Sequence, residues 1–184
     1  AYTINGVAQA PVISNGAGVA TLNALTNVAG PLVYAITMVT DNSSTLCSQT
    51  FNNVSTTVTV NDLPTASISG SATAVCLNAA SPTITLTGNG GTAPYTFIYS
   101  INGVPQPAVV SNAAGSYLIT VPTTVANTFT YAVTSVQEGS ANACTRSNLT
   151  GQLATVTINP LPAAAIAGAT TVCLNAPSPT VTFT

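Results

Sequence analysis

Charged side chains are nearly absent from this sequence of 184 residues, of which 2 % are Asp, Glu, Lys or Arg. An ordinary soluble domain contains about 25 %. Arg146 is the one basic side chain, so the chain has no cluster of Lys and Arg with which to hold a nucleic-acid backbone or an anionic membrane surface. We therefore exclude nucleic-acid binding, and we expect neutral Thr, Ser and Asn side chains to keep the surface hydrated.

Long apolar runs are missing as well, although 46 % of the residues are hydrophobic. A membrane-spanning helix needs about 20 consecutive apolar residues. The most apolar stretch, residues 160–174, is interrupted by prolines, by Gly168 and by two threonines. We expect no membrane insertion. The hydrophobic content instead predicts a chain that folds around a core.

The sequence does contain an internal repeat with a period of 97 residues. Residues 2–18 and 99–115 are identical at 11 of 17 positions; they begin with Tyr-Thr-Ile-Asn-Gly-Val and Tyr-Ser-Ile-Asn-Gly-Val. Residues 76–87 return as residues 173–184 with the same offset. Because the matches spread over a whole period, we interpret them as tandem copies of one structural unit.

Within a period the pattern predicts strands and no helix. Residues 83–87 alternate Thr with Ile and Leu, as a half-buried strand does. Asn102-Gly103 is a two-residue hairpin signal. Further inward rows are expected at Tyr95, Phe97, Tyr99 and Ile101; at Tyr117, Ile119 and Val121; at Phe129, Tyr131 and Val133; and at Val156 and Ile158. Six or seven short strands per period predict an all-β fold of tandem immunoglobulin-like β-sandwich repeats.

Leu-Pro dipeptides at 63–64 and 161–162 fall between the last strand of one unit and the first strand of the next, where proline stiffens the connection. We predict the C-terminal part of a repeat over 1–62, a complete repeat over 63–160, and the N-terminal strands of the next repeat over 161–184. The chain is then either a two-period window of a longer array, or a subunit whose C-terminal strands complete the N-terminal strands of the next copy. Both interpretations give a filament of repeats or copies joined head-to-tail.

Several segments together resemble a known family. They are Leu63-Pro-Thr-Ala-Ser-Ile-Ser-Gly, Val75-Cys-Leu-Asn, Gly90-Gly-Thr-Ala-Pro-Tyr-Thr-Phe, Tyr99-Ser-Ile-Asn-Gly and Ala154-Thr-Val-Thr-Ile-Asn-Pro-Leu-Pro. They resemble the PKD-like or Ig-like repeats of giant surface proteins of gliding bacteria, which are associated with type IX secretion and include gliding adhesins. The resemblance spans essentially the whole chain. It implies an exported filamentous or cell-surface protein without catalytic residues, although the tryptophan of the PKD core motif is absent.

Four cysteines at matching positions of the period indicate structural disulfides formed in an oxidising compartment. They are Cys47, Cys76, Cys144 and Cys173. In one pairing Cys76 joins Cys144 within the complete unit, and the other two cysteines bond to neighbouring repeats or chains. In the other pairing Cys47 joins Cys76, and Cys144 joins Cys173. We favour the first because a sandwich places consecutive domains end to end.

Catalytic and metal-binding groups are scarce. Histidine and lysine are absent, which removes the commonest general base and the amine of Schiff-base chemistry. The acids are Asp41, Asp62 and Glu138; Asp41 and Glu138 fall in separate predicted domains, too far apart for a glycosidase pair. Without CxxC or His we expect no zinc, and without clustered carboxylates no calcium. We predict no enzymatic activity, no cofactor and no metal, and we interpret Asp41 and Glu138 as solvated loop acids.

Two functions remain as hypotheses. The first is a structural repeat segment of an extracellular filament or surface stalk at the bacterial cell surface, with an adhesive role. The second is an adhesin module whose repeats bind glycans or surfaces directly, with Tyr95, Tyr99, Tyr117 and Tyr131 as a stacking platform. The inward rows on which these tyrosines fall favour core packing, so we expect the structural role.

Overall fold

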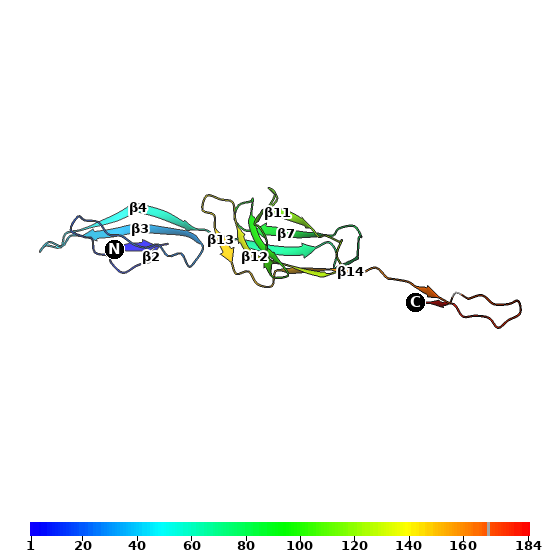
Figure 1. Ribbon diagram of the computed structural model, residues 1–184. Coiled ribbons are helices and arrows are strands. Elements are labelled where there is room, and N and C mark those ends of the chain that lie inside the picture. The colour runs from blue at the N-terminus through cyan, green and yellow to red at the C-terminus, as the bar shows by residue number, and fades with distance from the viewer. Residues whose placement is uncertain (169) are drawn as a thin grey trace.

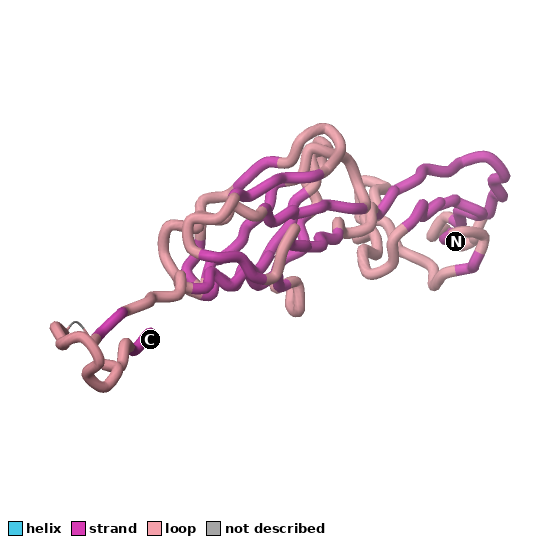
Figure 2. Tube along the Cα trace, turned by 90° about the vertical axis from the view of Figure 1, so that its right-hand side faces the viewer, coloured by secondary structure: helices cyan, strands magenta, loops and turns pink. Residues whose placement is uncertain are grey.

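The computed structural model describes residues 1–168 and 170–184, and these residues form strands and loops without a helix. Figure 1 and Figure 2 show three bodies in a line, which we call the N-terminal sheet (2–60), the central sandwich (64–159) and the C-terminal hairpin (165–184). In the described part of the chain no sheet combines strands from two of these bodies. The prediction of an all-β chain is confirmed.

The N-terminal sheet has four antiparallel strands in the order β2-β1-β3-β4. They are β1 (Tyr2–Ile4), β2 (Val7–Ala8), β3 (Gly30–Thr40) and β4 (Ser48–Val60). The C-terminal hairpin has two strands, β15 (Ile166–Ala167) and β16 (Thr182–Phe183). Each of these two bodies is a single layer, and many of their apolar side chains are exposed.

The central sandwich has two layers packed face to face. One layer has the strand order β11-β7-β5 and consists of β5 (Thr65–Gly70), β7 (Thr83–Asn89) and β11 (Ser116–Thr120). The other has the order β10-β8-β12-β14-β6, with β9 added to β8 and β13 added to β12. Its strands are β6 (Ala74–Cys76), β8 (Thr96–Ile101), β9 (Val104–Pro105), β10 (Val109–Val110), β12 (Thr128–Gln137), β13 (Thr145–Ser147) and β14 (Leu153–Asn159). All pairs are antiparallel except β14 with β6.

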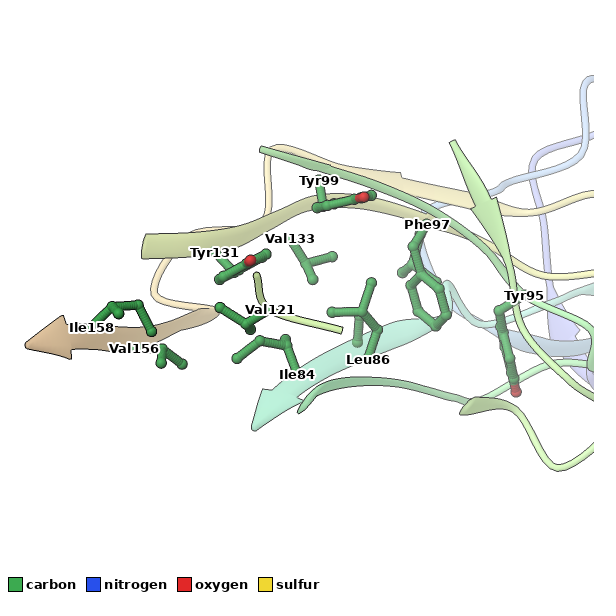
Figure 3. Close-up of a cluster of buried hydrophobic side chains, with 12 residues drawn as sticks. Ile84, Leu86, Tyr95, Phe97, Tyr99, Val121, Tyr131, Val133, Val156 and Ile158 are labelled. Carbon is green, nitrogen blue, oxygen red and sulfur yellow. The ribbon is translucent and has the colours of Figure 1, made fainter. Parts of the chain in front are cut away.

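The core of the central sandwich lies between these layers, and Figure 3 shows Ile84 and Leu86 of β7 pointing toward the facing layer. The buried apolar side chains are Ala66, Ile84, Leu86, Tyr95, Phe97, Tyr99, Val121, Tyr131, Val133, Val136, Val156 and Ile158. Half-buried side chains at the edge of the core include Ile101, Tyr117, Ile119 and Phe129. Because successive side chains of a strand point to opposite faces, the period of two in the sequence produces one apolar face per strand. The predicted inward rows are confirmed.

A β-bulge in β12 shifts the inward face of that strand. Its register with β8 jumps between Val133 and Ser135, so that Val133 is buried before the bulge and Val136 after it. An extra residue on one strand inverts the alternation that follows. In the N-terminal sheet the register of β3 also shifts between Ile36 and Met38, 97 residues earlier, but there the partner strand is β4.

The predicted hairpin at Asn102-Gly103 is also confirmed. Both residues have positive φ, 49° and 80°, the backbone that Gly adopts freely and Asn tolerates in a two-residue turn. The Asn102 side chain ties this turn to β12: Nδ2 donates to the Thr128 carbonyl at 3.1 Å, and Oδ1 accepts from the Thr130 amide at 2.7 Å. The turn therefore fixes the register of β8 on β12.

Candidate functional site

The loop at residues 138–144, which we call the Glu138 loop, connects β12 to β13 and is organised by a buried carboxylate. Glu138 is 4 % exposed. Its Oε2 accepts hydrogen bonds from the amides of Thr92 and Ser140, both at 3.0 Å. Its Oε1 accepts from the Cys144 amide at 3.1 Å and from the Ser140 hydroxyl. Since Thr92 belongs to the loop between β7 and β8, one side chain holds two loops together at this end of the sandwich.

These contacts lower the pKa of Glu138 from 4.5 to about 2. The hydrogen bond from the Ser140 hydroxyl is the largest cause; burial opposes it, and the amides of Thr92, Cys144 and Ser140 add to the lowering. A hydrogen bond from the Ser43 side chain is likewise the main cause that lowers the pKa of Asp41. A carboxyl whose pKa is lower in the folded state stabilises that state above its unfolded pKa, and the stabilisation is lost as the pH falls toward the folded pKa.

We expect Glu138→Gln to flatten the acid limb of the stability profile. The melting temperature of the unsubstituted chain should fall as the pH is lowered from 5 to 2, because the buried carboxylate must be protonated. In Glu138→Gln it should already be lower at pH 7, since the amide NH2 faces N–H donors, and it should fall less on acidification. Thermal unfolding followed by circular dichroism checks this, with Asp62→Asn, a change of an exposed linker acid, as the matched control. Equal pH slopes for the two variants would contradict the assignment.

The interpretation of Glu138 as a solvated loop acid is therefore wrong. The carboxylate is buried because backbone amides and a hydroxyl replace its water shell. A signal for this was present in the sequence: at both Asp41 and Glu138 an acid is followed two residues later by serine. Asp41 remains exposed, and its Oδ1 accepts from the Ser43 hydroxyl at 2.8 Å.

The within-unit disulfide expected from the sequence does not fit the fold. In the described chain all four cysteines are free thiols. Cys76 is the last residue of β6 and pairs with Asn159, at the end of the sandwich where β12 begins; Cys144 lies beyond the other end of β12. Ten residues of strand separate these ends by about 30 Å. A disulfide needs Cα atoms within about 7 Å, so Cys76 and Cys144 of one copy cannot bond.

The second pairing is also out of reach within one copy. Cys47 precedes β4, whose 13 residues separate it from the linker that leads into the central sandwich. Cys76 lies at the far end of that sandwich, beside Asn159. Cys173 lies beyond it, in the C-terminal hairpin (Figure 1). The four cysteines therefore mark the ends of the three bodies.

The N-terminal sheet carries an open groove of about 1250 Å³. It runs between strand β3 and the segment at residues 12–22. Its apolar lining includes Tyr2, Val19, Leu22, Tyr34, Ile36 and Val39. Ile36 is 42 % exposed, whereas Val133, 97 residues later, is 1 % exposed in the central core. The groove therefore occupies the position at which the central sandwich has its second layer.

Backbone and side-chain contacts recur at the period of the sequence. Asn5 makes the same two side-chain hydrogen bonds as Asn102. Its Nδ2 donates to the Pro31 carbonyl, and its Oδ1 accepts from the Val33 amide. The backbone hydrogen bond from Asp41 to Cys47 matches that from Glu138 to Cys144. The turn at Asn5-Gly6 has φ values of 49° and 80°, as at Asn102-Gly103. Equivalent residues thus take equivalent local structure in the N-terminal sheet and the central sandwich.

The candidate glycan platform is part of the core instead. Tyr95, Tyr99 and Tyr131 are buried, and Tyr117 is half-buried beside them. Burial is the main cause that raises the pKa of the Tyr99 and Tyr131 hydroxyls. The core interpretation of these side chains is confirmed.

Within residues 1–168 and 170–184, no three His, Cys, Asp or Glu side chains lie close enough to hold a metal ion. The described residues also include no helix of the length and apolarity needed to cross a membrane. Comparison with protein-family models, curated proteins and solved structures finds no match to this chain.

Proposed function

We propose that this chain is a structural segment of an extracellular filament or surface stalk at a bacterial cell surface, built from tandem immunoglobulin-like repeats of about 97 residues. The observation that carries the proposal is the recurrence of turns and hydrogen bonds at this offset in bodies that follow one another in a line. Such an array extends the chain in one direction and gives each body contact only with its neighbours.

The strand order of the central sandwich supports the immunoglobulin-like type. A layer of three strands, β11, β7 and β5, faces a layer in which β8, β12 and β14 are neighbours. Strand β6 follows β5 in the sequence but belongs to the second layer, where it pairs in parallel with β14. An immunoglobulin-like sandwich divides its strands between two sheets in this manner. The likeness to PKD-like repeats of gliding bacteria supports the same role.

The scarcity of charged side chains favours a passive mechanical role over recognition. No His or Lys is present, and the oxygens of Glu138 are occupied by its own loops. The tyrosines that could stack on a sugar are in the core. The proposal therefore assigns no catalytic activity to the chain and places adhesion in the assembled fibre rather than in a pocket of one repeat.

Electron microscopy of the native material tests the filament role. We expect a thin fibre with beads spaced by about 40 Å, since the 13 residues of β4 span about that length at 3.3 Å per residue. A glycan array probed with the same fibre should give no signal above that of control spots without a glycan. Native material consisting of dispersed single globules would contradict the proposal, and strong binding of one sugar would favour the recognition function instead.

A further inference from the structure

Two exposed apolar surfaces lie in the bodies on either side of the central sandwich. The N-terminal sheet has its open groove at one end, and the C-terminal hairpin lies at the other end, with the central sandwich between them (Figure 1). In the hairpin, Val181 is 52 % exposed and Phe183 is 77 % exposed. Because the sandwich separates the two surfaces, the hairpin of one copy cannot reach the groove of the same copy.

The central sandwich shows what fills such a groove. There, β7 is the middle strand of a three-stranded layer and places Ile84 and Leu86 against the facing sheet. Along its outer edge β7 pairs with residues 116–120. The equivalent residues of the N-terminal sheet are 19–23. Val19, Ala20 and Leu22 of this segment line the groove, and the segment joins no strand in the described part of the chain. Within the described residues, no strand lies beside residues 19–23 in the way that β7 lies beside β11.

The C-terminal hairpin already has the form of the missing layer. It pairs Ile166 with Phe183 and Ala167 with Thr182. Its first strand corresponds to β5 at the offset of 98 residues that relates the two Leu-Pro dipeptides, and its second strand corresponds to β7 at the offset of 97. The two pairs therefore reproduce those of Ile68 with Leu86 and of Ser69 with Thr85. Val181 and Phe183 take the places of Ile84 and Leu86. Within the described residues the other edge of β16 has no partner.

We propose that the C-terminal hairpin of one copy inserts into the groove of the next copy and completes its N-terminal sheet as a two-layer sandwich. The proposal deepens the filament role and rests on it, since it names a second copy of this chain as the partner. The contact is head-to-tail, so each addition leaves a free groove at one end and a free hairpin at the other. An interface of this kind grows into an open fibre.

The pairing register follows from the pairing of β11 with β7. Ser116 lies opposite Thr87 and Thr120 lies opposite Thr83 in the central sandwich. Shifted by one period, the segment 19–23 of the acceptor runs antiparallel to 180–184 of the donor. Val181 and Phe183 then point into the groove over Tyr34 and Ile36, and Thr182 points to solvent. Neither segment contains a charged residue, so we expect assembly to depend little on ionic strength.

The same arrangement brings cysteines of two copies to one junction. In the central sandwich the loop that holds Cys144 lies at the end where the chain enters β5. Glu138 of that loop accepts from the Thr92 amide, and Thr65, the first residue of β5, pairs with Asn89 just before Thr92. Cys47 is the equivalent residue of the acceptor, and Cys76 of the donor lies beside Asn159, just before the donor's own linker. By the same reasoning, Cys173 of the donor comes to the junction that holds Cys144 of the acceptor.

Complementary variants of the full chain test the proposal by analytical ultracentrifugation. The unsubstituted chain should show an average mass that rises with concentration above the single-chain 18.2 kDa. A donor variant, Val181→Asp with Phe183→Asp, and an acceptor variant, Ile36→Asp, should each remain at the single-chain mass. In an equimolar mixture, the intact hairpin of the acceptor variant can insert into the intact groove of the donor variant. The other hairpin and the other groove are disrupted, so the mixture should reach twice the single-chain mass and no more.

Matched controls separate assembly from misfolding. Thr182→Asp places a charge on the solvent side of the same strand and should polymerise like the unsubstituted chain. Near-ultraviolet circular dichroism should show an intact tyrosine core in every variant, since none of the substitutions touches the central sandwich. A mixture of the two variants that stays at the single-chain mass, or a donor variant that still polymerises, would overturn the proposal.

Oxidation of the assembled fibre tests whether its copies are joined head-to-tail. Two thiols react with oxidised glutathione, which takes up their two electrons and two protons and leaves as two glutathione thiols. Mass spectrometry should find Cys47 joined to Cys76 and Cys144 joined to Cys173 between copies, whereas bridges between like cysteines would overturn the head-to-tail order. Beaded native fibres together with a purified chain that is monomeric at every concentration would overturn hairpin insertion and leave the filament role standing.

Discussion

Tyr131→Ala should destabilise the central sandwich by about 3–5 kcal/mol, the range measured for truncating a large buried aromatic side chain. The Tyr131 ring is 1 % exposed and lies in the middle of the core (Figure 3). Its removal loses the transfer free energy of the ring and leaves a cavity between two layers that cannot close up. Since a domain of this size is stable by about 5–15 kcal/mol, the variant should unfold at much lower denaturant. Urea unfolding followed by circular dichroism gives the shift.

The chain offers its own matched control for this prediction. Tyr34 is the same residue one period earlier, but it lines the open groove and is only half-buried. In the monomeric donor variant, Tyr34→Ala should leave the unfolding midpoint of the central sandwich unchanged. Equal shifts for Tyr34→Ala and Tyr131→Ala would show that the two rings are equally buried in solution, contrary to the structure.

Gly88→Ala should destabilise the central sandwich by about 1–3 kcal/mol or more, through overpacking. A methyl group at Gly88 would overlap the ring of Tyr95. That ring cannot move away freely, because it is buried and its hydroxyl donates to the Gly90 carbonyl at 2.9 Å. The folded backbone has no positive φ at this position, so the cost comes from the ring contact and not from the turn.

Gly16→Ala is the control for Gly88→Ala. No atom lies within 4 Å of a methyl group added at Gly16, and its φ is not positive either. We expect a change within about 0.5 kcal/mol, as for ordinary surface substitutions. Thermal unfolding of both variants distinguishes the effects. A neutral Gly88→Ala would mean that the Tyr95 ring is not packed on the β7 backbone.

The strands and the core of the central sandwich could be predicted from local pattern. Alternation at residues 83–87 and the Asn102-Gly103 turn depend on neighbouring residues only, and both predictions hold. The inward place of Val136 could not be predicted, because the bulge before Ser135 is a property of how β12 meets β8. A bulge changes which face a residue occupies without changing its local sequence preference.

The candidate sites depended more on tertiary structure. The sequence placed cysteines at equal positions of the period, but only the strand directions put Cys76 and Cys144 at opposite ends of the unit. Glu138 was expected in solvent because a lone acid without a cation is usually hydrated. Its burial depends on the Thr92 amide, which comes from a loop 46 residues earlier in the chain.

By itself, the sequence determined that this protein is made of strands, repeats every 97 residues, and has very few charged side chains. These properties follow from residue type and spacing, which act over a few neighbours. The tertiary structure decided which side chains are buried, because burial needs a second layer. The central sandwich has that layer, and the N-terminal sheet, with much the same side chains, leaves its groove open.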